Sequence, residues 1–163
     1  MRLFTKEQTI PMALRLVENR PLETRPIAAL LADRYDLYLV WPHARWPFDH
    51  AQWRKALDPE AGRHAFLVCD RDRPVGHAAL VPSHDPAVYS LCFLYLLPEI
   101  RSRGRGGLTI SLLEHYARQR LCTARLLLRV LAHNLQAVNC YRKCGFQEYG
   151  RAGRLIKMSK ELG

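Results

Sequence analysis

Apolar positions along the chain fall into short runs typical of strands and longer stretches with helical spacing. The runs are bounded by turn residues and predict strands at residues 14–17, 65–69, 75–81, 91–97 and 124–131, with a closing hairpin of 146–149 and 155–159. Apolar residues three or four positions apart predict helices from 26 to about 33, after Asp49, from 108 to 116 and from 136 to 143. The order β-α-α-β-β-β-α-β-α-β-β predicts an α/β fold, in the α+β sense of a mixed sheet with helices on both faces.

One stretch fits neither pattern. Residues 35–48, YDLYLVWPHARWPF, are rich in aromatic side chains and interrupted by two prolines. Proline lacks an N–H and interrupts both helices and strand ladders, so we predict an irregular and partly exposed segment here. Asp49 then caps the second helix, in which Trp53 and Leu57 face inward.

The stretch from residue 90 to 120 combines a strand, a glycine-rich loop and a helix. Pro98 ends the strand, and the loop 101–107 that follows contains three glycines and three arginines. A helix N-terminus exposes unpaired N–H groups and a positive dipole end, and glycines let the backbone come close to a ligand. The stretch therefore predicts a seat for a phosphate or pyrophosphate. The alternative is a tight turn with a solvated basic surface.

Two widespread phosphate-binding motifs do not match this loop. A P-loop ends in Gly-Lys-Ser/Thr, whereas this loop ends in Gly106-Gly107-Leu108. The dinucleotide motif has the spacing G-x-G-x-x-G and an acid at the end of the next strand, whereas here the spacing is G-x-G-G and no acid stands at that position. Both ligand classes are therefore disfavoured.

Two separate motifs resemble the GNAT superfamily of N-acetyltransferases. The first, Arg101-x-x-Gly104-x-Gly106, is similar to that family's R/Q-x-x-G-x-G/A signature. Ser102 and Arg105 depart from the residues frequent there, but they keep the backbone donors. The second runs from Asn134 to Phe146 and is similar to the family's N-x-x-A-x-x-x-Y-x-K-x-G-F. The two motifs lie in the family's order, and between them they cover most of the C-terminal half of the chain.

The resemblance implies a GNAT-like, mostly antiparallel central sheet and acetyl-CoA as co-substrate. It implies that loop amides hold the pyrophosphate, that a bulge near Leu94–Leu96 exposes backbone groups to the pantetheine arm, and that an amine attacks the thioester directly. Tyr141 matches the family's general acid, although a tyrosine at this helical position also suits a core. The residues that the resemblance assigns to the cofactor are Leu94, Leu96, Arg101, Ser102, Arg103, Gly104, Arg105, Gly106, Gly107, Asn134, Ala137, Tyr141 and Lys143.

The general base is less well defined. Several family members carry a glutamate early in the central strand, where this chain has Tyr89-Ser90. His84, His77 and His43 are the candidates, and we predict that His84 is the base. The alternative for each is an ordinary surface histidine. Without a strong base, an amine of low pKa is favoured over a lysine ε-amine. We therefore expect an α-amine or a similar small primary amine as acceptor.

The aromatic stretch lies, in the family's layout, over the acceptor site. Its candidate acceptor-binding residues are Trp41, His43, Trp46 and Phe48. The alternative for all four is ordinary packing in the core and at its rim. Polyamine and aminoglycoside acceptors are less expected, because such cations need clustered carboxylates and this stretch has only Asp49 nearby.

Composition and charge narrow the classes of partner. The 163 residues predict one domain, 12–163, after a lead-in of residues 1–11. The 25 basic and 15 acidic residues give a net charge of +10, which favours anionic partners such as CoA. A non-catalytic CoA or RNA binder and an acetylase of aminoacyl-tRNA remain alternatives, and a homodimer through a sheet edge is considered.

The cysteine content and the hydropathy of the chain indicate its cellular compartment and whether a metal site is expected. The five cysteines are odd in number and scattered, so neither a disulfide framework nor a zinc site is predicted. The chain has no apolar run long enough for a membrane span, and its first residues have no signal-peptide pattern. A cytoplasmic location is expected.

Overall fold

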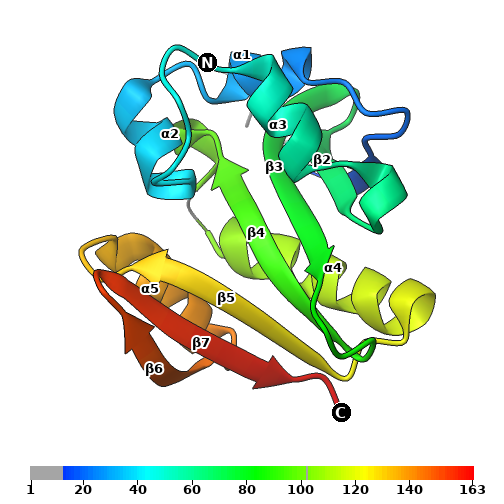
Figure 1. The fold of residues 1–163 in the computed structure, drawn as a ribbon, viewed down its shortest axis with the longest axis vertical. Coiled ribbons are helices and arrows are strands. Elements are labelled where there is room, and N and C mark those ends of the chain that lie inside the picture. Colours follow the sequence, from blue (N-terminus) through cyan, green and yellow to red (C-terminus); the bar gives the residue numbers. More distant parts are fainter. Residues whose placement is uncertain (1–12, 102) are drawn as a thin grey trace, which may run out of the picture.

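The computed structural model describes residues 13–101 and 103–163, which form one seven-stranded sheet covered by helices (Figure 1). The predicted lead-in lies outside the described residues. The strands follow the order β1-β2-β3-β4-β5-β7-β6, and every neighbouring pair is antiparallel except β4–β5. Their bounds are β1 Leu14–Glu18, β2 His64–Asp70, β3 Arg73–Pro82, β4 Val88–Leu96, β5 Arg125–Leu131, β6 Gln147–Ala152 and β7 Leu155–Glu161. The predicted mixed, mostly antiparallel sheet is confirmed.

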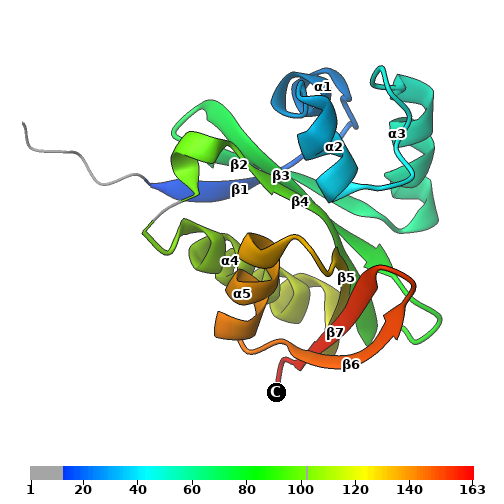
Figure 2. The same cartoon turned by 90° about the vertical axis from the view of Figure 1, so that its left-hand side faces the viewer.

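Helices cover both faces of the sheet, as predicted. Figure 2 shows α1, α2 and α3 on one face and α4 and α5 on the other. Their bounds are α1 Arg25–Leu30, α2 Arg34–Val40, α3 His50–Ala56, α4 Arg105–Leu121 and α5 Leu135–Lys143, with short 3₁₀ turns at Pro59–Ala61 and Pro98–Ile100. None of the described helices combines the length and the apolar character that a membrane span requires.

Helix α2 was not predicted, and the irregular segment expected at residues 35–48 is wrong over its first half. The Asp33 carboxylate caps α2 by accepting the backbone N–H of Asp36 at 2.9 Å. The prediction had instead placed Asp33 at the end of the preceding helix. Leu37 is buried against the sheet, so tertiary packing stabilises a helix of only seven residues.

Alternate residues of the strands feed two cores on opposite faces. Ala78 and Leu80 of β3 join the core under α4 and α5, while Ala79 between them joins the core under α1–α3. Trp53 of α3 is fully buried in the second core, as its predicted inward orientation requires. The sheet therefore separates the aromatic N-terminal layer from the layer that carries the glycine-rich loop.

The two central strands separate after a short stretch of pairing. β4 and β5 are paired only at Val88–Ser90 with Arg125–Leu127, and beyond these residues they diverge, as the green and yellow arrows of Figure 1 show. β4 also contains a bulge. Tyr95 pairs with His77 and Cys92 with Ala79, so two residues of β4, 93 and 94, lie opposite Ala78 alone. The bulge expected near Leu94–Leu96 is thus found one residue earlier.

Candidate active site

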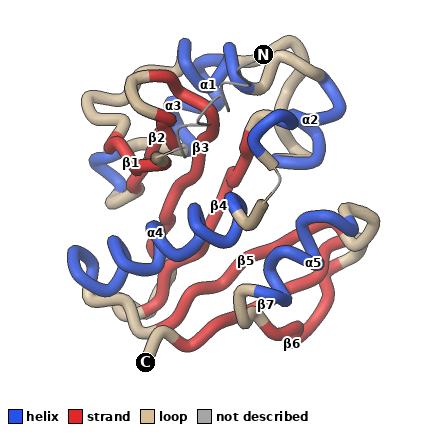
Figure 3. The backbone as a smooth tube through the Cα atoms, turned by 180° about the vertical axis from the view of Figure 1, so that it is seen from behind, coloured by secondary structure: helices blue, strands red, loops and turns tan. Residues whose placement is uncertain are grey.

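A cleft of about 1110 Å³ opens where β4 and β5 diverge. Its walls are the open edges of the two strands, residues 90–96 and 127–130, and its ends are formed by the glycine-rich loop, α5 and the end of α2. Figure 3, which views the molecule from behind, shows α4 and α5 in front of the diverging strands. The cleft therefore collects residues from helices and strands that are far apart in the sequence.

The glycine-rich loop presents the N-terminus of a long helix to this cleft. Arg103 and Gly104 have φ angles of +61° and +75°, a left-handed turn that glycine adopts without strain. Gly104 is the N-cap of the 17-residue α4, and no side chain caps the helix there. The N–H groups of its first turn therefore remain available for an anion. Ser102, the other predicted loop residue, lies outside the described residues.

Glycine at position 106 is required by close packing between α4 and α5. A Cβ atom there would lie 2.9 Å from the Cys140 Sγ, well inside normal contact. At the next position, Gly107, an added Cβ would be 3.7 Å from the Cys144 Sγ, which is ordinary contact. The loop and the helix that carries Tyr141 are therefore held together directly beside the cleft.

Arg101, the first residue of the motif, is anchored within the protein. Its Nε donates to the Leu96 carbonyl at 2.6 Å, and its guanidinium lies 5.0 Å from the centre of the Tyr95 ring. The Tyr95 hydroxyl donates to the Asp36 carboxylate at 2.8 Å, and Arg101 Nη2 is 3.9 Å from the same oxygen. Burial and the bond to Asp36 raise the pKa of Tyr95 to about 12. These contacts tie α2 to the end of β4.

Helix α5 supplies the second motif. The Asn134 side chain caps it by accepting the Ala137 N–H at 3.4 Å, and Gly145, with φ +95°, follows its end as predicted. Tyr141 is buried, and its ring packs edge-on against Phe146 at 5.9 Å. Burial raises the pKa of the Tyr141 hydroxyl above its ordinary value of 10. The phenol is therefore protonated throughout the physiological range.

Cys92 and Cys144 are two of the three cysteines that line the cleft, and burial disfavours the reactive form of both thiols. Burial raises the pKa of Cys92 to about 11, and burial with the neighbouring Cys140 does the same for Cys144. The thiolate is the reactive form of cysteine, so both groups are inert at neutral pH.

Every described residue predicted for the cofactor lines this one cleft. These twelve are Leu94, Leu96, Arg101, Arg103, Gly104, Arg105, Gly106, Gly107, Asn134, Ala137, Tyr141 and Lys143. Residues from two motifs some 30 positions apart are thereby brought to one surface. Their individual roles stay predictions.

Only some of the residues predicted to bind the acceptor or to act as the base line the cleft. Trp41 and His43 line the cleft, whereas Trp46 is exposed elsewhere and Phe48 stacks on Trp53 at 5.4 Å. His84, the predicted base, is exposed in the hairpin between β3 and β4 and is not part of the cleft lining. The structure thus gives His84 no place beside a bound acceptor.

Asp36 and Tyr95 were missed by the sequence analysis, although both line the cleft. Asp36 lies in the segment predicted to be irregular, and its partners are 59 and 65 residues away in the chain. Only the capping pattern of Asp33 could have revealed that Asp36 belongs to a helix.

Sequence comparison gives the family. The profile of the Acetyltransferase (GNAT) family matches residues 27–146, about three quarters of the chain. The chain belongs to the GNAT acetyltransferase family. A search of curated proteins gives no significant match to this GNAT protein. The predicted family is thus confirmed by a match that includes both motifs.

Solved structures share the fold of this GNAT protein. The spermidine N-acetyltransferase of Vibrio cholerae, in complex with CoA and spermine, has a TM-score of 0.73 and 20% identity over 91% of this chain and 95% of its own. The N-acetyltransferase PseH of Campylobacter jejuni, in complex with acetyl coenzyme A, has a TM-score of 0.67 and 18% identity, covering 93% of this chain and 100% of its own. A dodecameric structure of the Vibrio enzyme in an intermediate state scores 0.69 at 19% identity over 91% and 94%. At these identities the likeness supports the fold alone.

The charge lining the cleft of this GNAT protein is unevenly distributed. Among the described lining residues Asp36 is the only acid, against the five basic residues Arg101, Arg103, Arg105, Arg129 and Lys143. Asp36 already accepts a hydrogen bond from Tyr95. The cleft therefore favours an anion over most of its length and offers one partly neutralised carboxylate to a cation.

Proposed function

We propose that this protein transfers the acetyl group of acetyl-CoA directly to a primary amine of low pKa. One observation carries the proposal: the uncapped N-terminus of α4 and Tyr141, whose hydroxyl is protonated, line the same cleft between two open strand edges. A helix N-terminus binds phosphate groups, and a phenol can protonate a departing thiolate. A cleft for a CoA thioester needs both functions.

The residues that line the cleft fit acetyl-CoA in charge and in polarity. The first-turn amides of α4 and the arginines at 101, 103 and 105 suit the pyrophosphate, because all are donors or cations. The open edges of β4 and β5 offer backbone groups to the amides of the pantetheine arm. When bound, acetyl-CoA supplies an activated acetyl thioester, and the protein orients it.

Tyr141 would protonate the leaving sulfur. The thiol of CoA has a pKa near that of cysteine, about 8.5, so its thiolate needs a proton at neutral pH. Burial raises the pKa of Tyr141, which keeps the phenol protonated until the thiolate forms beside it. This role favours catalysis over the non-catalytic binder considered from the sequence.

The acceptor is proposed to be an α-amine or a similar small primary amine. The described cleft holds no carboxylate free to act as a strong base, because Asp36 is paired with Tyr95. Deprotonating a lysine amine of pKa about 10.4 near pH 7.4 costs about 4 kcal/mol, whereas an α-amine of pKa about 8 needs less than about 1 kcal/mol. His43, at the acceptor end of the cleft, is the remaining histidine candidate for proton removal.

A polyamine acceptor, such as the spermine bound by the Vibrio enzyme, fits this cleft less well. Several ammonium groups require several carboxylates, and five basic residues of the lining would repel them.

We also propose that residues 12–163 act as one acetyltransferase domain, within which the family match lies.

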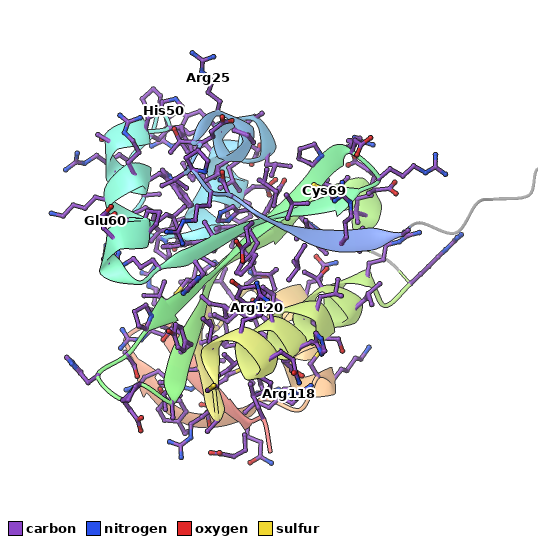
Figure 4. All side chains as sticks on the ribbon, turned by 90° about the vertical axis from the view of Figure 1, so that its right-hand side faces the viewer. Arg25, His50, Glu60, Cys69, Arg118 and Arg120 are labelled. Atoms are coloured by element: carbon purple, nitrogen blue, oxygen red, sulfur yellow. The ribbon has the colours of Figure 1, made fainter. Side chains whose placement is uncertain are left out.

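The distribution of positive charge argues against an RNA-binding face. Arg25 projects from the start of α1, whereas Arg118 and Arg120 lie on α4 across the sheet (Figure 4). All three side chains are exposed. A nucleic-acid footprint usually gathers its basic residues on one face. Five basic residues, by contrast, line the one cleft.

The test is calorimetric titration with acetyl-CoA of the wild type, Gly104→Asn and Gly104→Asp. The two variants match in shape, asparagine and aspartate tolerate a positive φ, and nothing lies within 4 Å of an added Cβ. A carboxylate about 6 Å from one phosphate charge is repelled by roughly 3 kcal/mol at an effective dielectric constant of about 20, which is about 100-fold in affinity.

We expect tight binding by the wild type, a modest loss in Gly104→Asn and a further loss of up to about 100-fold in Gly104→Asp. Equal affinities for the two variants would place the pyrophosphate elsewhere. A folded wild type that binds no acetyl-CoA would overturn the proposal and direct attention to RNA. An acceptor screen at pH 7 then compares peptide α-amines with lysine ε-amines, and comparable rates on both would refute the proposed acceptor.

A further inference from the structure

The bulge of β4 contains a backbone conformation that is unusual for its residue. Phe93 has φ +55°, in the left-handed region that bulky side chains rarely adopt. Its ring is held by Trp41 and Trp53, each about 5.0 Å away between ring centres. Strained residues of this kind persist only where their surroundings hold them, and they gather at functional sites.

A buried histidine holds the carbonyl of this strained residue. The Nδ1 atom of His77, on the neighbouring strand β3, lies 3.0 Å from the Phe93 carbonyl oxygen. A carbonyl only accepts, so Nδ1 carries the proton and donates it. His77 is fully buried, which lowers its pKa to about 4 and keeps the ring neutral. The tautomer of His77 is therefore determined by this contact.

The orientation of one further group follows from the geometry of the peptide bond. The Phe93 carbonyl and the Leu94 N–H belong to the same planar trans peptide, in which C=O and N–H point in opposite directions. Since the carbonyl points to the His77 ring, which meets Trp53 in the core under α1–α3, the Leu94 N–H points to the opposite face of the sheet, where α4 and α5 lie. Leu94 lines the cleft, on the side where β4 has already separated from β5.

His77 is not itself placed to react. It does not line the cleft, and the Nε2 atom is buried without a hydrogen-bond partner among the described residues. Its ring meets that of Trp53 edge-on in the core under α1–α3, with 6.0 Å between the ring centres. An acceptor amine in the cleft would have no route to this nitrogen. The histidine can act only through the peptide that it holds.

We propose that His77 is a positioning residue: by holding the Phe93 carbonyl, it turns the Leu94 N–H towards the acetyl carbonyl of bound acetyl-CoA. This inference rests on the proposed function. The oxygen of that carbonyl gains negative charge as the amine attacks, and a fixed N–H donor stabilises it. A free Leu94 peptide could rotate the donor away.

The test compares His77→Asn with His77→Leu. These side chains have nearly the same shape, and the asparagine Nδ2 can donate from close to the position of the histidine Nδ1, whereas leucine has no donor. Calorimetry measures the affinities for acetyl-CoA and for CoA, which has no acetyl carbonyl. No acceptor amine is needed. Circular dichroism confirms that both variants are folded.

The expected result is a specific loss of acetyl recognition. In His77→Leu the affinity for acetyl-CoA falls roughly threefold to tenfold, as for one hydrogen bond, while the affinity for CoA stays within about twofold of the wild type. His77→Asn restores the affinity for acetyl-CoA. Once an acceptor amine has been identified, the kcat of His77→Leu is expected to fall about 100-fold, whereas the KM for acetyl-CoA changes much less.

Each other outcome overturns the inference. Equal losses in both variants would mean that His77 only fills volume, and parallel losses for CoA and acetyl-CoA would mean that it only supports the fold. Unchanged binding and turnover in both would show that the contact has no role. If the wild type binds neither ligand, the proposed function fails first, and this result is distinct from the other three.

Discussion

Substituting Gly106 with alanine tests the contact that joins the two motifs. The added methyl group would lie 2.9 Å from the Cys140 Sγ, about 0.8 Å closer than an ordinary carbon–sulfur contact of about 3.7 Å. Cys140 belongs to α5 and lies next to Tyr141, so the overlap is relieved only by rotating the thiol or by moving α5. Gly107→Ala is the matched control, because its methyl group would be 3.7 Å from the Cys144 Sγ.

The two substitutions should change stability in opposite directions. Replacing glycine by alanine in a helix stabilises it by about 0.5–1 kcal/mol, and this gain applies to both positions. Overpacking a well-filled contact costs about 1–3 kcal/mol, and this term applies only at Gly106. The net expectation is a loss of about 1 kcal/mol in Gly106→Ala and a gain of about 0.5–1 kcal/mol in Gly107→Ala.

Urea unfolding of four proteins measures the interaction directly. The wild type, Gly106→Ala, Cys140→Ala and the double variant form a double-mutant cycle, which isolates the energy between the two positions. Removing the Cys140 sulfur should relieve the overlap, so Gly106→Ala becomes neutral or stabilising in that background. Acetyl-CoA affinity, measured on the same samples, should fall in Gly106→Ala and recover in the double variant.

Two results would refute the reasoning. If Gly106→Ala is as stable as Gly107→Ala, the approach of α4 to α5 is looser than the structure shows. If the loss persists unchanged in the Cys140→Ala background, the overlap lies with some other group. In either case glycine at position 106 would need another explanation, such as the close approach of a ligand to the backbone.

The remaining predictions concern the acid and the buried histidine. Tyr141→Phe should lower kcat by about 10²–10⁴-fold while acetyl-CoA affinity measured by calorimetry stays within about twofold, and an unchanged kcat would exclude Tyr141 as the proton donor. The pKa of His77 is lowered by burial from 6.5 to about 4, so between these pH values the unfolded chain binds a proton that the native state does not. Stability should therefore fall by up to about 3 kcal/mol as the pH drops from 6.5 to 4, and urea unfolding of His77→Asn across this range should lack that loss, whereas identical pH profiles would contradict the burial of a neutral ring.

The sheet could be predicted from the sequence because its signals are local. The central strands are runs rich in apolar residues that are closed by residues such as Pro98 or by the turn at 70–74, and all seven predicted strands form. Helix α2 escaped prediction since its seven residues depend on the burial of Leu37, which no local pattern reports. The same aromatic run that looks irregular in isolation becomes helical once a core is available for it.

The residues of the site show the same difference between short-range patterns, which could be predicted, and long-range contacts, which could not. The glycine spacing of the loop and the spacing of the α5 motif are short-range patterns, and their residues meet in one cleft as predicted. The Asp36–Tyr95 bond joins residues 59 positions apart, and the contact of His77 with Phe93 depends on strand register. Such contacts exist only in the folded chain. His77 was therefore considered from the sequence only as a base, a role that its burial removes.

The short pairing of β4 with β5 also determines where backbone amide hydrogens are least protected from exchange with solvent. Only the ladder at Val88–Ser90 and Arg125–Leu127 joins the two parts of the sheet, while α4 packs against β1 and α5 across the gap. Cooperative units of a protein separate where the fewest backbone hydrogen bonds hold them. Amide hydrogens beside this ladder should exchange with solvent faster than those of the β2–β3 and β5–β7 pairs. A ligand that hydrogen-bonds to the open edges of both β4 and β5 would connect the two strands further and slow that exchange.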